Sequence, residues 1–420
     1  MKDMETIGKS ARQASKKLAV LDTEVRNKGI VLIAEALLNA QDSIIAENAK
    51  DIHVGEQKGL SSAALDRLLL NSSRLESMSS DMLRVADLPD PISEVVDMNI
   101  MPNGMEVGRK RVPLGVIGVI YESRPNVTID ISSLCLKSGN AVIMRGGSEA
   151  FQSNTVLTQV IQKALSQAGI PEEAVQSVGS TDRALISEML NLNKYIDLMI
   201  PRGGKDLVDM VNREAKMPSI TGGVGVCHVY VDEFASVEMA VKVVYNSKVQ
   251  RPSVCNALDT ILVHASSAPN FLPRIASVFA EAGVEMRCDT RSRSILGRRD
   301  DIKIEAAVSS DWDTEHLSLT VGVKVVDSLT NGLEHIDRHG TGHTDAIITE
   351  NKASGDIFLR TVDSSVVMLN ASTRFNDGGE LGLGAEVAIS TNKLHARGPM
   401  GLRELTSYKW LVLGNGHTRN

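Results

Sequence analysis

The sequence has few cysteines and few aromatic residues, and each shortage excludes a class of protein. Four cysteines occur in 420 residues, and no two stand at CxxC spacing, so a disulfide framework is excluded. Aromatic residues make up 3% of the chain, too few for a surface that stacks nucleic-acid bases. The net charge of -7 also disfavours a polyanionic partner, and we therefore expect no nucleic acid to bind.

Long apolar runs are missing as well. The longest, Val112 to Tyr121, is about half the length of a membrane span. The first residues are charged and then polar, without the apolar core of a signal peptide. With 42% hydrophobic and 23% charged residues, the composition is that of an ordinary globular protein. We expect a cytoplasmic protein with reduced thiols and no membrane association.

Several familiar catalytic and ligand-binding motifs do not occur in the sequence. It contains no GxGxxG, GxxxxGK[ST], HExxH or GxSxG pattern. His335, His339 and His343 follow one another at four-residue steps, a spacing that can place metal ligands on one helix face. The charged residues between them indicate a solvent-exposed segment, and no neighbouring thiolate or glutamate completes a site. We therefore expect no metal.

The order of apolar segments predicts the fold class. The first ~95 residues repeat apolar positions every three or four residues, which is typical of helices. From Asn140 onward, short apolar strands alternate with amphipathic helices. The strands that we expect are 141–144, 174–178, 196–200, 224–231, 258–263, 321–326, 345–349 and 366–369. Strands separated by helices predict parallel sheets, and hence an α/β fold with two α/β lobes.

Two other segments look extended without belonging to this alternation. Val107 to Tyr121 resembles a hairpin arm, and Ser407 to Gly414 resembles a short strand that we expect to pair with another subunit's edge. In parallel sheets, ligands bind at the carboxyl ends of strands, so the loops 145–149 and 201–204 are the first places to expect a site.

Cys255 differs from the other three cysteines in its surroundings. It follows Lys248, Arg251 and the helix-breaking Pro252, and nearby cations favour the nucleophilic thiolate. The other cysteines, at positions 135, 227 and 288, lie in plainer contexts. From the residues alone, Cys255 can be read equally well as a nucleophile or as buried filler.

At this point the sequence resembles a known family. The run from Pro113 to Ile120, then Arg124-Pro-Asn126, Gly139 to Arg145 and finally Cys255 are similar to the pattern of the aldehyde dehydrogenase superfamily. The strings YESRPNVT, MRGGSE, IPRGG, ITGGVGVCHVYVD, QRPSVCN, DSSVVMLNASTRFNDGGELGLGAE and LHARGPMGL more closely resemble its branch that reduces the acyl phosphate L-glutamyl 5-phosphate in proline biosynthesis. This likeness covers nearly the whole chain in collinear order.

The resemblance implies catalytic roles for matching positions. Cys255 matches the catalytic thiol, and Asn126 matches the asparagine whose amide stabilises the oxyanion together with the backbone N–H of the thiol residue. Aldehyde dehydrogenases that hydrolyse their thioester carry a glutamate before a Gly-Gly pair, whereas Ile220 and Thr221 stand there in this chain. Neither can take a proton at neutral pH, so activation of a water molecule is not expected.

The resemblance also implies the cofactor and its ligands. Arg145 stands where the superfamily has a strand-end lysine that contacts the adenosine ribose, and a guanidinium there suits the 2′-phosphate of NADPH. Gly146 and Gly147 follow in the same loop, and Glu315 falls where a glutamate holds the nicotinamide ribose. We assign the binding of the anionic substrate to three arginines. Arg251 would bind the leaving phosphate and Arg374 the α-carboxylate, and Arg124 is the third.

The expected domains follow from the same likeness. Residues 1–98 and 120–228 would form a cofactor-binding domain, 229–400 a catalytic domain, and 99–119 with 401–420 a small β oligomerisation arm. We expect a homo-oligomer, and the lability of acyl phosphates makes glutamate 5-kinase a partner to consider. Two alternatives stay open: a reductase with a different acyl group, and a nucleotide-binding scaffold without catalysis.

Overall fold

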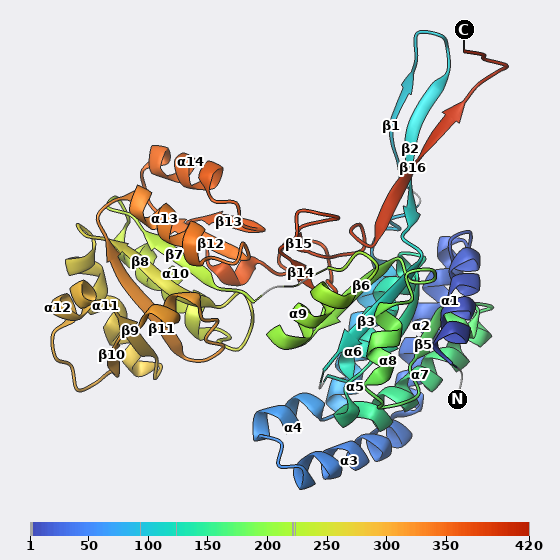
Figure 1. Ribbon diagram of the computed structural model, residues 1–420, viewed down its shortest axis with the longest axis horizontal. Helices are drawn as coiled ribbons and strands as arrows, with labels where there is room; N and C mark the ends of the chain where they lie inside the picture. Colours follow the sequence, from blue (N-terminus) through green and yellow to red (C-terminus); the bar gives the residue numbers. More distant parts are fainter. Residues whose placement is uncertain (1–2, 93, 123, 221, 223, 420) are drawn as a thin grey trace. The chain divides into compact units, whose positions relative to one another are not determined.

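The alternation of strands and helices becomes two α/β units in the computed structural model, which describes residues 3–92, 94–122, 124–220, 222 and 224–419 (Figure 1). Unit 1 comprises Met1–Thr221, Gly382–Ala388 and Met400–Asn420. Unit 2 comprises Gly222–Leu381 and Ile389–Pro399. Each unit contains a parallel sheet, so the predicted α/β fold with two parallel-rich lobes is confirmed.

Unit 1 begins with a helical layer. Its helices are α1 Met4–Leu18, α2 Thr23–Asn39, α3 Gln41–Gln57, α4 Ser62–Leu68 and α5 Ser72–Asp87. A buried arginine connects this layer to the segments that follow it. Arg26 of α2 pairs with Asp90 at 2.6 Å and donates to the carbonyl of Lys137. Because the guanidinium is almost fully buried, it can satisfy its charge only through these partners.

The sheet of unit 1 has the strand order β5-β4-β3-β6 and is parallel throughout. Its strands are β3 Val116–Tyr121, β4 Ala141–Arg145, β5 Val175–Ser177 and β6 Leu198–Arg202. The helices that alternate with them are α6 Asn126–Lys137, α7 Phe151–Gln167, α8 Ala184–Leu190 and α9 Lys205–Glu214. The parallel order places the segments after β3, β4 and β6 together at one edge, the carboxyl edge of this sheet.

A separate three-stranded antiparallel sheet forms the predicted arm. It has the order β1-β2-β16, with β1 Val95–Ile100, β2 Glu106–Pro113 and β16 Thr406–Leu413. In Figure 1 these strands extend away from the rest of unit 1. The arm begins at Val95 rather than at residue 99, and residues from Val116 onward belong to β3 instead, because every residue of that strand is buried.

The tail strand pairs within its own chain on one of its two edges. β16 pairs with β2 along its whole length, from Thr406 opposite Pro113 to Leu413 opposite Glu106. Its expected pairing with another subunit's edge stays a prediction. β1 and β16 remain the two edges of this sheet.

Unit 2 is built on a seven-stranded parallel sheet of order β10-β9-β11-β8-β7-β12-β13. Its strands are β7 Cys227–Val231, β8 Leu258–His264, β9 Glu285–Cys288, β10 Ile304–Ala306, β11 Thr320–Val326, β12 Thr344–Ile348 and β13 Val366–Leu369. The helices are α10 Val237–Val249, α11 Ala268–Glu281, α12 Thr290–Leu296, α13 Leu329–His339 and α14 Lys352–Thr361. β7 and β8 are buried at every position, including their polar residues His228, Asp259, Thr260 and His264.

The boundaries of the units differ from the expected ranges. The chain passes from unit 1 to unit 2 at Gly222 rather than at residue 229, and residues 382–388 return to unit 1. A short hairpin of β14 Ile389–Ser390 and β15 Gly398–Pro399 belongs to unit 2. The chain therefore crosses between the units more often than the sequence indicated.

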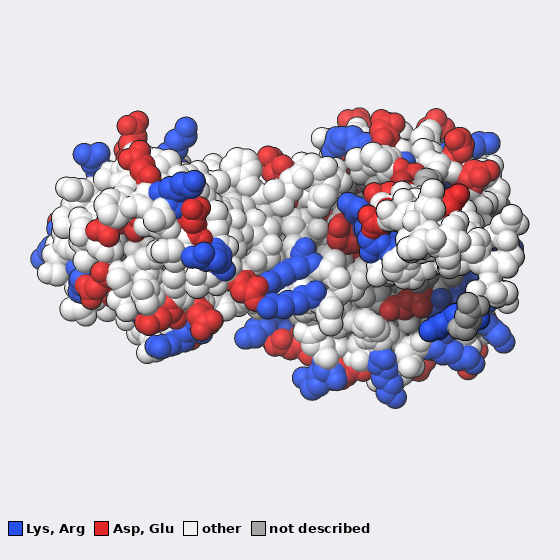
Figure 2. Space-filling model, turned by 90° about the horizontal axis from the view of Figure 1, so that it is seen from above, with Lys and Arg blue, Asp and Glu red and all other residues white. Residues whose placement is uncertain are grey.

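Figure 2 shows acidic and basic side chains mixed over the face that it draws. Among the described residues, no single helix has the length and apolar composition needed to cross a membrane. α2 and α3 pass that test together, by length and composition, with a bend of 70° between them.

Candidate active site

Cys255 lies in the turn between α10 and β8, at the edge of the unit 2 sheet where the strands begin. The residue is partly exposed, and the chain becomes buried immediately after it, from Asn256 into β8. The Asn256 side chain donates to the carbonyl of Asn376 at 2.9 Å, which anchors this turn to the segment after β13. Cys255 is therefore partly accessible in a turn that is anchored at its end.

The segment before β7 packs directly against the backbone of this turn. A Cβ atom on Gly225 would lie 1.9 Å from the Cys255 carbonyl oxygen, so no larger residue fits at this position. The Gly225 N–H donates to Glu315 Oε1 at 3.1 Å, and burial raises the pKa of that glutamate. Glu315 thus lies in unit 2 beside the thiol turn, where its carboxylate already supports the backbone.

Beneath the turn, Lys248 and Asp259 form a buried pair whose charges partly compensate each other. Lys248 Nζ donates to the Leu258 carbonyl at 2.7 Å and lies 3.9 Å from Asp259 Oδ1. Burial lowers the pKa of Lys248 to about 8 and raises that of Asp259 to about 6. Asp259 also accepts from the N–H groups of His316 and Cys227. Lys248 is therefore a structural group that holds the start of β8.

Arg251 and Arg374 provide positive charge near Cys255. Arg251 is exposed, and Arg374 Nε donates to Gln250 Oε1 at 2.7 Å, at the end of α10. Burial lowers the pKa of Arg374, while the negative charge of Asp377 raises it and the charge of Arg251 lowers it. Cys255 also acts on this guanidinium electrostatically. The structure thus brings three of the predicted site residues, Cys255, Arg251 and Arg374, into one region of unit 2.

The remaining three cysteines are buried, and burial raises the pKa of each thiol. Cys135 in α6 and Cys227 at the start of β7 are completely inaccessible. For Cys288, at the end of β9, burial raises the pKa to about 12. All four cysteines lie in the described part of the chain and are present as thiols. Cys255 is the thiol that a solute can reach.

Asn126 and Arg124 lie in unit 1, directly after β3. Asn126 is the first residue of α6, and its Nδ2 donates to Asp130 Oδ2 at 3.0 Å, one helical turn later. Burial raises the pKa of Asp130 to about 6, with an opposing effect of the Asn126 hydrogen bond. One N–H of the Asn126 amide is therefore used within the helix and the other is available to a ligand. Arg124 is exposed at the same edge.

Arg145, Gly146 and Gly147 form the turn between β4 and the next helix. Arg145 is 8% exposed as a residue, and its guanidinium donates to the Thr181 carbonyl at 3.2 Å and keeps a buried Nε without a partner in the structure. A Cβ on Gly146 would lie 2.1 Å from the Asn154 amide, so the backbone passes as close to its neighbours as glycine allows. An arginine with spare donors beside a tight glycine turn is suited to hold a phosphate.

The histidines singled out in the sequence differ from the expectation. His335 and His343 are buried rather than exposed, because the face of α13 that carries His335 packs on the sheet. A thiol does lie near them: Cys227 Sγ is 3.8 Å from His343 Nδ1. Even so, among the described residues no group of three or more His, Cys, Asp or Glu side chains is placed to hold a metal ion.

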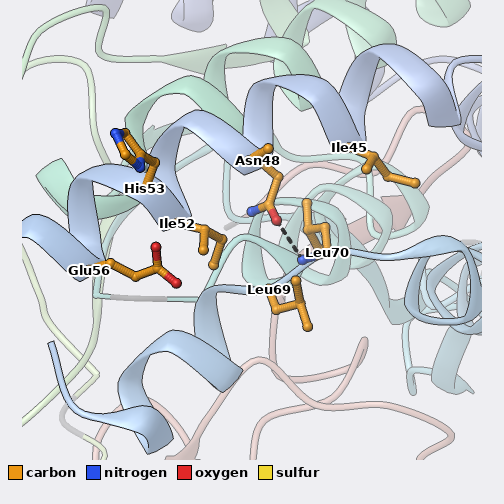
Figure 3. A pocket seen from close by; sticks show the side chains of 8 residues that line it. Ile45, Asn48, Ile52, His53, Glu56, Leu69 and Leu70 are labelled. Atoms are coloured by element: carbon orange, nitrogen blue, oxygen red, sulfur yellow. Dashed lines mark hydrogen bonds between the residues drawn. The ribbon is translucent and has the colours of Figure 1, made fainter.

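A shallow pocket of about 210 Å³ on the helical layer of unit 1 contains none of the predicted site residues (Figure 3). α3 and the Leu69–Leu70 segment line it with mainly apolar side chains. The Asn48 side chain accepts from the Leu70 N–H at 2.8 Å and so serves to fix this segment.

The residues that the sequence did not reveal are supporting groups. Gly225 and Asp130 contact predicted site residues, and Asp259 holds Lys248 and the N–H groups of His316 and Cys227. Nothing in the sequence spacing of these three residues indicates these contacts. The sequence shows that residue 227 is a cysteine. It does not show that the Cys227 thiol donates to the backbone carbonyl of Cys255, because every residue has such a carbonyl.

Known proteins resemble this chain over its whole length. Residues 1–294 match the profile of the aldehyde dehydrogenase family. The gamma-glutamyl phosphate reductase of Dehalococcoides mccartyi strain CBDB1 is 51% identical over 417 residues, which cover 99% of this chain and 98% of that protein. The crystal structure of the gamma-glutamyl phosphate reductase of Thermotoga maritima is 42% identical, with a TM-score of 0.97 over 100% of both chains. An engineered glycolyl-CoA reductase solved with NADP+ is 17% identical, with a TM-score of 0.70 over 98% of this chain and 97% of that one, and shares the fold.

Exposure predicts how the native protein reacts with a thiol reagent. Under brief treatment with iodoacetamide, we expect modification of Cys255, while the other three cysteines stay unmodified until the chain is unfolded. Peptide mass spectrometry before and after addition of urea measures this. Native labelling of Cys227 or Cys288 at the rate of Cys255 would contradict the assignment.

Asp130 predicts a pH-dependent effect on stability. Its native pKa is raised to about 6, whereas an unfolded aspartate titrates near ~4. Between these values the native chain binds more protons than the unfolded chain, so this group lowers stability as the pH rises through that window. Asp130→Asn should therefore raise the free energy of unfolding by about 1 kcal/mol at pH 7.5, a gain that disappears near pH ~4.

Urea unfolding at the two pH values measures this difference. The exposed Asp209→Asn in α9 is the matched control and should change stability by less than about 0.5 kcal/mol at either pH. Equal effects of Asp130→Asn at both pH values would show that its carboxyl group does not titrate in this range.

Proposed function

The chain belongs to the aldehyde dehydrogenase family, and within it to the gamma-glutamyl phosphate reductases, and from this premise we propose that it reduces L-glutamyl 5-phosphate to L-glutamate 5-semialdehyde and phosphate. The observation that carries the proposal is a single reachable thiol, Cys255, in a turn with two arginines nearby. An enzyme of this kind has its place in the biosynthesis of proline.

Cys255 provides the nucleophile. Its thiolate attacks the δ-carbonyl of the acyl phosphate, a C–S bond forms, and the C–O bond to phosphate breaks with its electron pair leaving on phosphate. Phosphate is a good leaving group, so no strong acid is needed at this step. Arg251 is assigned to the departing phosphate and Arg374 to the α-carboxylate, since guanidinium groups bind both anions through paired N–H donors.

Asn126 and the backbone N–H of Cys255 are assigned to the oxyanion. A donor of this kind typically contributes ~100-fold or more to the rate. The Asn126 amide is held by Asp130, so that one of its N–H groups is directed away from its own helix turn. The same two donors serve when the thioester carbon becomes tetrahedral for the second time and the Cys255 thiolate departs.

A nicotinamide cofactor supplies the hydride that reduces the thioester, and we assign NADPH. The fit of the protein supports this choice: Arg145 has a buried, unpartnered Nε beside the tight Gly146-Gly147 turn at the end of β4. These groups would hold the 2′-phosphate and the adjoining backbone of the nucleotide. Glu315 is assigned to the nicotinamide ribose. One of its carboxylate oxygens accepts from the Gly225 N–H, so the ribose would have to bind the other oxygen.

Discharge of the thioester to water is disfavoured by the residues before β7. Ile220 is buried and apolar where hydrolytic relatives need a base, while Thr221 and Gly223 lie outside the described residues. An enzyme that receives its acyl group from an acyl phosphate and releases it by reduction does not need that base.

Assembly and location follow as further proposals. We propose a cytoplasmic homo-oligomer in which the arm contacts a second copy. Its β16 carries Trp410 and Val412 exposed to solvent, and Arg109 lies over the rings of Tyr408 and Trp410 at 4.9 and 5.8 Å. Exposed apolar groups on an edge strand are typical of contacts between chains. Transfer of substrate from glutamate 5-kinase is a proposal based on the lability of the acyl phosphate.

The reverse reaction tests the function directly. Protein, NADP+, phosphate and glutamate 5-semialdehyde should give a phosphate-dependent rise in absorbance at 340 nm. Cys255→Ala should lower the rate by more than about 1000-fold while NADPH still binds, because both chemical steps use one thiol. Cys288→Ala, which removes a buried thiol of the same unit, is the control. A rise that needs no phosphate, or activity in Cys255→Ala, would refute the proposal.

The cofactor assignment has its own test. Arg145→Ala should weaken NADPH binding by about 10- to 100-fold and NADH binding by much less, because the lost contact is to the 2′-phosphate. Nucleotide fluorescence titrations measure both affinities. Arg213→Ala, an exposed arginine of α9, should change neither. Equal losses for the two nucleotides would remove Arg145 from 2′-phosphate recognition.

A further inference from the structure

A second cysteine contacts the backbone of the reactive one. Cys227 is the first residue of β7, its side chain is completely buried, and its Sγ donates to the carbonyl oxygen of Cys255 at 3.2 Å. β7 pairs with β8 through Cys227 and Leu258, and the register shifts immediately afterwards. The thiol of Cys227 therefore contacts the turn that precedes β8, and not the hydrophobic core that begins after this turn.

Cys227 acts as a hydrogen-bond donor and not as a second nucleophile. Burial raises its pKa well above the ordinary value, and the negative charges of Asp259 and Asp345 raise it further. The group thus stays protonated at any pH where the protein works, and its proton remains on the sulfur.

The segment that carries Cys227 is itself fixed at each residue. The Gly225 N–H donates to Glu315, the Val226 N–H donates to Thr341 Oγ1 at 3.0 Å, and the Cys227 N–H donates to Asp259 Oδ2 at 3.3 Å. The Cys255 carbonyl oxygen itself occupies the space that a Cβ of Gly225 would need, so this carbonyl packs directly against the Gly225 backbone. The Cys255 carbonyl therefore packs against an anchored segment and accepts a hydrogen bond from the Cys227 thiol.

We propose that Cys227 is a positioning residue that orients the backbone of Cys255 for attack and for oxyanion binding, an inference that rests on the proposed function of Cys255. A nucleophile displaced by about 1 Å can lose ~100-fold in rate, so a fixed peptide unit beside the thiol matters for catalysis. The hydrogen bond is weak by itself, but it acts at the residue that both chemical steps share.

Substitution of Cys227 separates positioning from packing. Cys227→Ala removes the donor and should lower kcat about tenfold with KM nearly unchanged, as expected for one lost hydrogen bond. Cys227→Ser keeps a donor on a side chain of similar size and should recover most of kcat. Cys288→Ala, the same change at a buried cysteine of β9, should leave kcat unchanged.

Hydrogen exchange measured by mass spectrometry gives a readout that needs no substrate. The peptide covering residues 250–257 should exchange about fivefold to tenfold faster in Cys227→Ala than in the unmodified protein or in Cys227→Ser. If the alanine variant does not fold, Cys227→Val fills the space without a donor and must show the same losses.

Unchanged kcat and exchange in the donor-free variants would overturn the inference, as would a serine variant that is impaired as much as the alanine variant. If the unmodified protein shows no phosphate-dependent reaction, the proposed function fails, whereas the exchange measurement still decides whether Cys227 holds the Cys255 backbone.

Discussion

The proposed chemistry depends on one constraint: the thiol that we assign as the nucleophile must be open to solvent while the backbone that carries it is immobile. The fold meets both demands by placing Cys255 in a turn just before β8, a strand that is buried at every position. Three anchors hold the turn, namely the Asn256 side chain on Asn376, the Cys227 thiol on the Cys255 carbonyl, and the close contact of Gly225. Each anchor uses a backbone group or a small residue, so the thiol itself stays accessible.

The two units use opposite edges of their parallel sheets. In unit 1 the predicted ligand residues follow the strands β3 and β4, at the carboxyl edge that such sheets commonly use for nucleotides. In unit 2 the thiol precedes its strand, and the neighbouring segments that support it precede β7 and β11. This division matches the chemistry, because cofactor binding and nucleophilic attack require different surroundings. The first needs backbone donors and a phosphate-binding arginine, and the second needs a partly exposed thiol near positive charge.

The sequence was sufficient for the fold class, and it singled out Cys255 as a candidate nucleophile, which stays a prediction. Periodicity located most strands to within a few residues, and β13 agrees with the expected range of 366–369 at both ends. Periodicity did not predict to which sheet a strand belongs where contacts between distant segments determine this. Val116 to Tyr121 continues the apolar run that begins at Val112 in the arm, and its burial at every position comes from pairing with β4 and β6, far along the chain.

The candidate site shows the same limit. The family resemblance pointed to Cys255, Asn126 and Arg145, and their assigned roles stay predictions. The supporting groups were not predictable, because their partners are carbonyl oxygens and N–H groups that every residue possesses. The exposure expected for the histidine segment failed for a related reason: His335 is next to charged residues in sequence but faces the sheet in space.

The most direct measurement is to trap the acyl group on the protein. Enzyme, glutamate 5-semialdehyde and NADP+ are mixed without phosphate and quenched in acid, which protonates the α-amino group and prevents it from attacking the thioester. Digestion and mass spectrometry should then find a glutamyl group on the peptide that contains Cys255, and adding phosphate before the quench should remove it. An active enzyme that carries no acyl group, or that carries it on another residue, would contradict the account.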